Sequence, residues 1–299
     1  MELRGFAKYD DYVLLKTTKG RLKLEPFGDS VVRIVYTQEE SFSDKKSLIV
    51  LPEAKSTANW RIDEYSDYLE LATDRLKIRI SKKSCAFSYY DSDGRLLVKE
   101  PESGGKYLSE IDVYKYVYDK EHEITSFQSV DGLRTDAAGA GRIKDRTAYH
   151  TKLMFEWTEG EALYGLGSHE EGIMNLRGSH QYLYQQNMKA VVPMLISTRG
   201  YGILLDTYSL VIFRDDVYGS YLWTDTDDEM DYYFIYGAGF DDIIGSYRKL
   251  TGKAPLLPKW AYGYIQSKER YTSQEELIST VRGFRKRRIP LDLIVLDWM

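Results

Sequence analysis

A strand–helix–strand pattern over residues 260–296 is the feature that most restricts how this chain can fold. Two apolar stretches, Trp260–Gln266 and Leu291–Leu296, flank a helix that begins at a capping box, Ser273-Gln-Glu-Glu276. The apolar face of that helix contains Leu277, Ile278, Val281 and Phe284. A single helical crossover predicts a parallel pair of strands with a right-handed connection. Because parallel strands are normally covered on both faces, a lone pair would be unstable, and we expect the chain to end inside a domain.

The first 239 residues show short strands separated by turns. Leu76, Ile78 and Ile80 alternate with charged residues, which is the period of a half-buried strand. Asp91-Ser-Asp-Gly94 is typical of a hairpin turn. The other predicted strands are Tyr12–Lys16, Arg21–Pro26, Val31–Tyr36, Ala86–Tyr90, Leu96–Lys99, Leu153–Trp157, Met194–Ser197, Gly202–Leu205 and Tyr232–Tyr236. This spacing, without intervening helices, predicts an antiparallel β-sandwich, whereas residues 100–147 are predicted as long loops or an exposed hairpin.

The pattern changes after residue 239. Asp241-Asp242 is predicted to cap a short helix that closes at Gly252 in the C′ position. The apolar face of this helix would contain Ile243, Tyr247 and Leu250. Residues 253–258 include two prolines and predict a stiff linker. We therefore expect a β-sandwich domain over residues 1–252 and the truncated start of another domain over residues 253–299.

The composition argues against several classes of protein. The chain has 41 basic and 46 acidic side chains, and its net charge of −5 argues against nucleic-acid binding. A single cysteine, Cys85, excludes an internal disulfide. With no visible secretory signal and no apolar run of the ~20 residues that a membrane span needs, we expect a cytoplasmic protein with no membrane partner. A homo-oligomer is compatible with the sequence. The 26 tyrosines favour either a β-rich core or a surface that stacks on sugars.

Two groups of motifs are specific enough to indicate a protein family. The first group is Leu163-Tyr-Gly-Leu-Gly167, Asn175-Leu-Arg177-Gly178, Gln185-Gln-Asn187, Val192-Pro193 and Gly200-Tyr-Gly-Ile-Leu-Leu-Asp206. The second group is Pro258-Lys-Trp-Ala-Tyr-Gly-Tyr-Ile-Gln-Ser-Lys268 and Ile294-Val-Leu-Asp297-Trp298. In this order, the motifs resemble glycoside hydrolase family 31, the α-glucosidase and α-xylosidase family. The resemblance is specific from about residue 160 onward and only architectural before it.

This resemblance implies a mainly β fold, with a galactose-mutarotase-like antiparallel β-sandwich followed by the first β-α-β unit of a (β/α)8 TIM barrel. It also implies retaining catalysis by two aspartates at the ends of later barrel strands. No catalytic residue is therefore expected within these 299 residues. Neither a metal nor an organic cofactor is implied, and the expected partner is an oligosaccharide or another α-glycoside substrate.

The resemblance further implies substrate-binding residues, because barrel enzymes build their sites at the C-terminal ends of strands. Asp297 would hydrogen-bond a hydroxyl of the sugar in the −1 subsite; the alternative is an ion pair with a neighbouring strand-end Lys or Arg. Trp298 would wall the same subsite, or pack under a loop. Gln266 and Lys268, at the end of the first barrel strand, are candidates to face the pocket. Asn187 lies in the sandwich loop that reaches over the barrel mouth in the family, where some relatives carry an aspartate.

The function implied is that of an N-terminal part of a retaining, exo-acting α-glucosidase, with α-xylosidase as the alternative within the same family. The bulk of Trp298 favours a restricted pocket and hence xylose, but the opposite wall of the pocket is expected outside this chain. An alternative of another class is a non-catalytic carbohydrate-binding or scaffolding sandwich. This alternative is compatible with the many tyrosines, and with the expectation that no catalytic aspartate lies within these residues.

Overall fold

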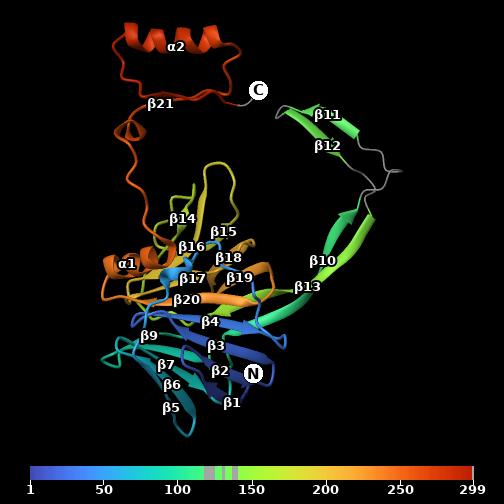
Figure 1. The fold of residues 1–299 in the computed structure, drawn as a ribbon, viewed down its shortest axis with the longest axis vertical. Coiled ribbons are helices and arrows are strands. Elements are labelled where there is room, and N and C mark those ends of the chain that lie inside the picture. The colour runs from blue at the N-terminus through green and yellow to red at the C-terminus, as the bar shows by residue number, and fades with distance from the viewer. Residues whose placement is uncertain (118–124, 130–131, 137–140, 298–299) are drawn as a thin grey trace. The chain divides into compact units, whose positions relative to one another are not determined.

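The computed structural model describes residues 1–117, 125–129, 132–136 and 141–297 (Figure 1). The chain forms two compact units, one of residues 1–115 with 144–253 and one of residues 116–143 with 254–299. The expected domain limits, 1–252 and 253–299, remain a prediction.

The larger unit is built on an antiparallel sheet of eight strands in the order β1-β2-β3-β4-β20-β17-β16-β14. These strands are β1 (Leu3–Lys8), β2 (Val13–Thr17), β3 (Gly20–Pro26), β4 (Val31–Thr37), β14 (Leu163–Ser168), β16 (Ala190–Ser197), β17 (Tyr201–Leu205) and β20 (Met230–Tyr236). Strand β4 pairs with β20 from Val31↔Ile235 to Tyr36↔Met230. Sequence segments almost two hundred residues apart therefore meet in the middle of this sheet.

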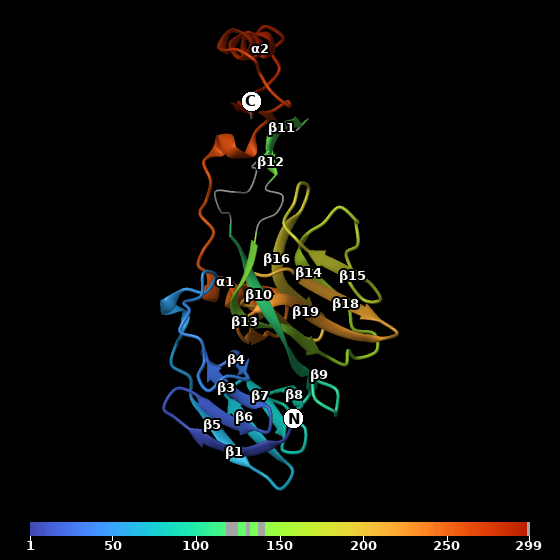
Figure 2. The ribbon, with the colours of Figure 1, turned by 90° about the vertical axis from the view of Figure 1, so that its right-hand side faces the viewer.

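A second sheet, with the strands β5 to β9 in sequential order, packs on one face of the first (Figure 2). Its strands are β5 (Trp60–Glu64), β6 (Tyr68–Thr73), β7 (Leu76–Ser81), β8 (Phe87–Asp91) and β9 (Leu96–Lys99). Burial alternates residue by residue along β7, as its sequence period predicts. The Tyr89 ring stacks on that of Phe234 with centroids 3.9 Å apart, and the Tyr89 hydroxyl lies 2.8 Å from that of Tyr232. These contacts confirm the predicted β-sandwich.

A third sheet has the order β10-β13-β19-β18-β15. Its strands are β10 (Lys106–Val117), β13 (Gly141–Met154), β15 (His180–Leu183), β18 (Val211–Asp216) and β19 (Gly219–Asp227). Of the two predictions for residues 100–147, the exposed hairpin is the correct one, since β10 and β13 are paired neighbours whose distal halves are solvent-exposed. That exposure removes the apolar alternation by which strands are recognised. Strands β11 (Thr125–Ser129) and β12 (Gly132–Asp136) form a separate hairpin in the smaller unit.

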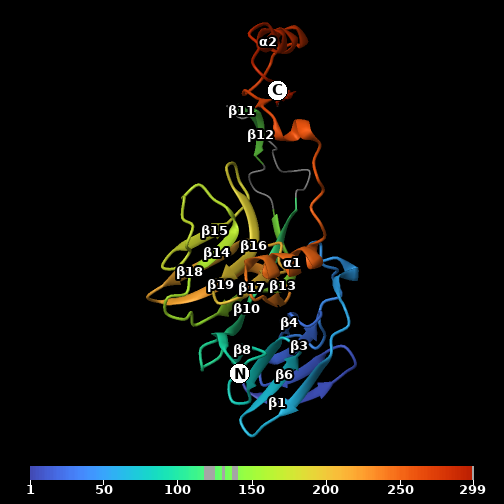
Figure 3. The ribbon, with the colours of Figure 1, turned by 90° about the vertical axis from the view of Figure 1, so that its left-hand side faces the viewer.

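Helix α1 (Phe240–Thr251) covers the face of the eight-stranded sheet that points away from the sandwich core (Figure 3). Ile243 and Leu250 are buried there, as predicted. The predicted Asp241-Asp242 cap is wrong, because the helix begins after Gly239, whose carbonyl accepts the amide of Ile243 at 3.2 Å. The two acids fall in the first turn instead, where the positive end of the helix dipole favours them.

Residues 254–297 form the predicted β-α-β unit, with shorter strands than expected. Its elements are the 3₁₀ turn Lys259–Tyr262, β21 (Ile265–Gln266), α2 (Gln274–Lys286) and β22 (Leu293–Ile294). The two strands are parallel, which confirms the predicted topology. The predicted lengths, 260–266 and 291–296, are wrong because a strand extends only as far as a partner backbone lies opposite, and the ladder here spans two residues on each side. Neither α1 nor α2 has the length and apolar character that a membrane-crossing helix requires.

The Tyr-Gly-Leu-Gly motif ending at Gly167 forms a bulge in strand β14. Gly165, Leu166 and Gly167 all have positive φ values of 103°, 62° and 97°, and the pairing of β14 with β16 shifts register across them. This bulge turns Leu166 into the core, where it is 1% exposed. A Cβ on Gly167 would lie 2.0 Å from the carbonyl oxygen of Ala190, so glycine is required there for space as well as for conformation.

Candidate functional site

The carboxyl ends of β21 and β22 define one edge of the β-α-β unit. Of the five predicted site residues, Gln266 is the last residue of β21 and three others follow the two strands in sequence. Ile265 pairs with Leu293 and Gln266 with Ile294, and the amide of Val295 donates to the carbonyl of Gln266 at 2.9 Å. At the opposite edge, the amide of Asp292 donates to the carbonyl of Tyr264 at 3.0 Å. Because the strands are parallel, the residues that follow Gln266 and Ile294 leave the ladder at the same edge.

The Gln266 side chain is held by its own segment. The hydroxyl of Tyr264 donates to Gln266 Oε1 at 2.6 Å, while Nε2 donates to the carbonyl of Ser267 at 3.1 Å and to the Tyr271 hydroxyl at 3.3 Å. These contacts fix the half-buried amide at the end of β21. Such an amide can offer both a donor and an acceptor to a sugar hydroxyl after a small rotation.

The Lys268 ammonium is engaged in the loop between β21 and α2. It lies 2.5 Å from Glu276 Oε1 and 4.7 Å from the centre of the Tyr271 ring. Glu276 also accepts from the amide and hydroxyl of Thr272, and the Lys268 contact, together with these bonds, lowers its pKa to about 2. Ser273 accepts the amide of Glu276 at 3.1 Å, as the predicted capping box requires, but the Glu276 carboxylate reaches Thr272 rather than Ser273. Lys268 therefore ties the loop to the helix start in this structure.

Asp297 follows β22 and is half-buried. Its position after the carboxyl end of that strand agrees with the expected placement of a substrate-binding acid in a barrel. Trp298 lies outside the described residues. The substrate-binding roles of Asp297, Trp298, Gln266 and Lys268 remain predictions.

Asn187 belongs to the larger unit, in the exposed turn between β15 and β16. The turn is closed from within by Gln185, which accepts the amide of Val191 at 3.0 Å and donates to the carbonyl of Lys189. Lys189 is also 2.9 Å from the carboxylate of Glu171. These bonds shape the turn around Asn187, and its contact with substrate remains a prediction.

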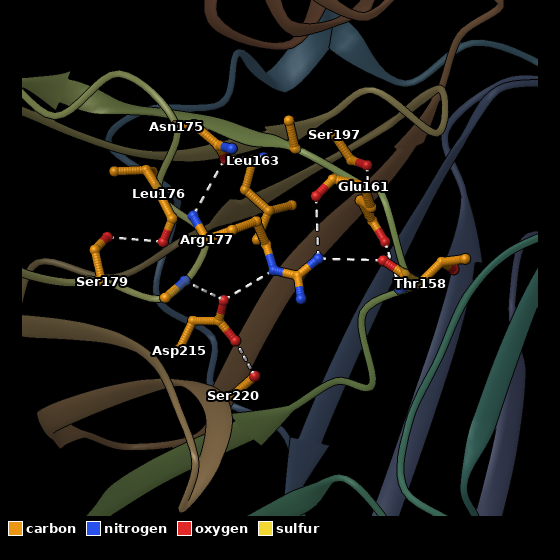
Figure 4. A network of polar contacts seen from close by, with 12 residues as sticks. Thr158, Glu161, Leu163, Asn175, Leu176, Arg177, Ser179, Ser197, Asp215 and Ser220 are labelled. Carbon is orange, nitrogen blue, oxygen red and sulfur yellow. Dashed lines mark hydrogen bonds and ion pairs between the residues drawn. The ribbon is translucent and has the colours of Figure 1, made fainter.

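The Asn175-Leu-Arg177-Gly178 motif has a structural role that the sequence alone does not reveal (Figure 4). Arg177 Nε donates to Asp215 Oδ2 at 2.8 Å, and its Nη1 donates to the carbonyls of Thr158 at 3.1 Å and Glu161 at 3.0 Å. Asn175 accepts the amides of Leu163 at 3.1 Å and Arg177 at 3.2 Å. The motif thus joins the loop before β14 to strand β18.

Two buried carboxylates complete this network. Burial alone would raise the pKa of Asp215, but bonds from Ser220, the Gly178 amide and Arg177 outweigh it and hold that pKa below its usual value. Glu161 is 4% exposed and accepts from the hydroxyls of Ser197 and Tyr201 and from the Thr158 amide. A fully bonded buried network of this kind makes one arrangement of the surrounding loops much more stable than others. Among the described residues, no three His, Cys, Asp or Glu side chains are arranged to hold a metal ion.

Comparison with known proteins identifies two domain types. Residues 21–213 match the galactose mutarotase-like N-terminal domain of glycosyl hydrolase 31, and residues 254–299 match the glycosyl hydrolases family 31 TIM-barrel domain. An α-xylosidase of Saccharolobus solfataricus is 35% identical over 286 residues, which cover 93% of this chain and 34% of that protein. An uncharacterized family 31 glucosidase of Pseudescherichia vulneris is 27% identical over 281 residues, covering 93% of this chain and 50% of that protein.

The fold has a close counterpart among solved structures. A GH31 α-xylosidase from Xanthomonas citri superposes with a TM-score of 0.78 at 20% identity, covering 98% of this chain and 45% of that one. At this identity, the likeness concerns the fold alone. The chain spans between about a third and a half of the length of the curated relatives described above.

Proposed function

This chain belongs to glycoside hydrolase family 31, and on that premise we propose that it is the N-terminal portion of a retaining, exo-acting α-glycosidase with α-xylosides as its preferred substrates. Residues 1–252 would form its sandwich domain and residues 253–299 the start of its catalytic barrel. The single observation that carries the proposal is the pair of domain matches, in the order sandwich then barrel. None of the residues described here is assigned as nucleophile or general acid.

The preference for xylose is supported by similarity to the Saccharolobus solfataricus α-xylosidase, which extends over almost the whole chain. The sequence alone placed α-glucosides first, and these remain the second candidate because a relative named as a glucosidase also matches. Within this family the two sugars differ by one hydroxymethyl group at C6. An enzyme distinguishes the two sugars by whether its pocket has room and hydrogen-bond partners for that group. Such a difference changes the transition-state binding free energy by only about 1–3 kcal/mol.

The geometry supports a binding role for the edge that carries Gln266 and Asp297. Gln266 is the last residue of β21 and Asp297 follows the parallel strand β22, so both belong to the carboxyl ends of strands, where barrel enzymes place substrate contacts. A carboxylate that accepts two sugar hydroxyls fixes the orientation of the ring, and such charge-assisted bonds are about twice as strong as neutral ones. We propose that Asp297 belongs to the −1 subsite and that Gln266 and Lys268 are further substrate contacts of the barrel. A substrate contact of Asn187 is proposed from the family resemblance alone.

The activity is tested with nitrophenyl α-xyloside, α-glucoside and α-galactoside on the full-length protein that carries this chain. We expect the highest kcat/KM for the α-xyloside, a lower value for the α-glucoside, and none for the α-galactoside. The 299-residue chain alone should release no nitrophenol. If the full-length protein hydrolysed none of the three but bound oligosaccharides, the non-catalytic sandwich would replace the proposed enzyme.

The binding role of Asp297 is tested by Asp297→Asn in the full-length protein. Losing the charge should raise KM, lower kcat, and reduce kcat/KM at least about tenfold, or ~1.4 kcal/mol of transition-state stabilisation. Asp292→Asn is the matched control, because Asp292 lies at the opposite end of the same strand, where it accepts the amide of Tyr264 at 3.2 Å. The control should keep kcat/KM within about twofold. Equal kinetics for Asp297→Asn and the wild type would remove Asp297 from the subsite.

A further inference from the structure

Residues 38–51, called the strap here, join β4 to the 3₁₀ turn Pro52–Ala54 in the larger unit. From Gln38 to Val50, no main-chain to main-chain hydrogen bond fastens the strap to any described residue. The first such bond joins the Leu51 amide to the carbonyl of Leu250 at 2.8 Å. A segment without ladder bonds depends on its side-chain contacts, and it is therefore the kind of segment that opens locally while the core stays folded.

Val50, at the end of the strap, packs into the apolar cluster beneath α1. Most of the polar contacts that hold the rest of the strap lead to acidic groups or their neighbours. The amide of Ser43 donates to Glu229 Oε2 at 3.0 Å, and the Lys45 ammonium pairs with Asp228. The amide of Leu48 donates to the Tyr208 hydroxyl at 2.6 Å. That hydroxyl in turn donates to the carboxylate of Asp206 at 3.0 Å. Two further contacts hold the start of the strap: the Gln38 side chain donates to the carbonyl of Leu108 at 3.2 Å, and the Glu39 carboxylate accepts from the Tyr149 hydroxyl.

Beneath the strap lies a cavity of about 390 Å³. It is lined by strap residues, by the turn between β19 and β20, and by charged groups from β4, β13, β19, β20 and the loop after β17. The acids that face it are Asp206, Asp225, Asp227, Asp228, Glu229 and Asp231. The cations are Arg33, Lys45, Lys46 and Arg146. A second hollow beside Glu229 adds Glu39, Glu40 and Asp44, and Lys23 acts on Glu229 from β3. The acids therefore outnumber the cations around Glu229.

Several cations in this cavity already have a carboxylate partner. Arg33 forms a bidentate pair with Asp231, with its Nε 2.9 Å from Oδ1. Lys45 and Arg146 both contact Asp228. The cavity thus leaves Glu229 and Asp227 with little positive charge to balance their own. One buried oxygen of Asp206, Oδ2, also has no hydrogen-bond partner among the described residues.

Closure of the strap therefore partly buries carboxylates that repel one another. Burial raises the pKa of Glu229 to about 7, with the Ser43 amide opposing the rise and the charge of Asp231 adding to it. Burial likewise raises the pKa of Asp227 to about 6, against hydrogen bonds from Thr224 and Thr207. If the strap lifts, Glu229 is hydrated again and loses the cause of its shift. The Ser43 contact survives protonation, because a neutral carboxyl group still accepts a hydrogen bond through its carbonyl oxygen.

We propose that residues 38–51 form a pH-sensitive strap, which lies closed over the acidic cavity at mildly acidic pH and lifts as the pH rises past neutral. The sign follows from proton linkage. The closed state holds the Glu229 proton more tightly than the open state, so closure takes up a proton between the two pKa values and is favoured as the pH falls. This device is independent of the proposed glycosidase activity.

The test is hydrogen exchange of the 299-residue chain at pH 5.5 and pH 8.0, with each rate divided by the intrinsic chemical rate at the same pH. Protection of a peptide covering residues 41–50 should be about tenfold lower at pH 8.0. A peptide from the β16–β17 hairpin should keep its protection at both values. Equal strap protection at the two pH values, or a parallel loss in the hairpin peptide, would overturn the proposal.

The variant Glu229→Gln removes the titrating group with almost no change in shape. Its strap should lose most of the difference in protection between pH 5.5 and pH 8.0, with the remainder due to Asp227. Glu40→Gln is the matched control, because Glu40 lies on the strap and is exposed, and it should keep the wild-type pH dependence. If Glu229→Gln folded but kept the full pH dependence, the proposal would fail. Asp227→Asn is a second test of the same device. It should reduce the difference in strap protection between pH 5.5 and pH 8.0, and an unreduced difference in that variant would also contradict the proposal.

Discussion

Replacing Arg177 with methionine should lower the free energy of unfolding by about 3 kcal/mol. The substitution keeps an unbranched apolar stem but removes the group that neutralises Asp215, whose side chain is 8% exposed. It also removes the donor to the carbonyl of Glu161 and leaves the carbonyl of Thr158 with the Glu161 amide alone. Removing one partner of a buried pair costs more than the pair contributes, because the remaining charge stays buried without compensation.

The measurement is urea unfolding of the 299-residue chain followed by tryptophan fluorescence, with Arg214→Met as the matched control. Arg214 pairs with Asp216 on the same strand as Asp215, but its side chain is 44% exposed. Exposed ion pairs contribute at most about 1 kcal/mol, so the control should shift the transition only slightly. Equal effects of the two substitutions would mean that the Arg177 network is no more important than a surface ion pair.

Replacing Gly167 with alanine should destabilise the chain by at least about 2 kcal/mol. Two costs add at this position. The backbone has a φ of 97°, which residues with a Cβ rarely adopt, and the new Cβ would meet the Ala190 oxygen at 2.0 Å and the Val192 nitrogen at 2.8 Å. Both obstacles are main-chain atoms of the paired strand, so relief requires that the β14–β16 ladder separate. The pairing that buries Leu166 would be lost with it.

Gly172→Ala separates these two costs. Gly172 also has a positive φ, 67°, but nothing lies within 4 Å of its Cβ position. The free energy of unfolding of this control should therefore fall only by the cost of a positive φ at alanine, about 1 kcal/mol. The difference between the two midpoints of thermal unfolding measures the steric part. If Gly167→Ala were no worse than Gly172→Ala, the close approach of β16 would not be what requires glycine.

Local sequence signals predicted the parts of the fold that depend on local physics. The alternation in β7, the turn before Leu96 and the apolar face of α1 all match the structure. Strands β10 and β13 gave weaker signals, because their distal halves are exposed and carry no apolar period. The lengths of β21 and β22 could not be read from sequence either, since the length of a ladder depends on the partner backbone rather than on the residues of the strand itself.

The same distinction applies to the candidate site. The carboxyl-end positions of Gln266 and Asp297 follow from the β-α-β pattern, which is local. The network around Arg177 joins Thr158 to Ser220 across sixty residues of sequence, so no window of the sequence contains it. Only the motif order pointed to residues 175–178, and it gave no hint that they hold loops together. The acidic cavity is equally nonlocal, because its cations come from segments distant from the acid-rich turn.

The buried tyrosines of the core also affect the stability of this protein at high pH. Tyr89, Tyr201 and Tyr232 are fully buried, and burial raises the pKa of each well above its usual value of 10. A phenol that holds its proton more tightly when folded than when unfolded adds stability below pH 10, and that stability is lost as the pH climbs toward the folded-state pKa. The buried rings are therefore shielded from base until the sandwich opens. For these residues, ionisation and unfolding are a single event.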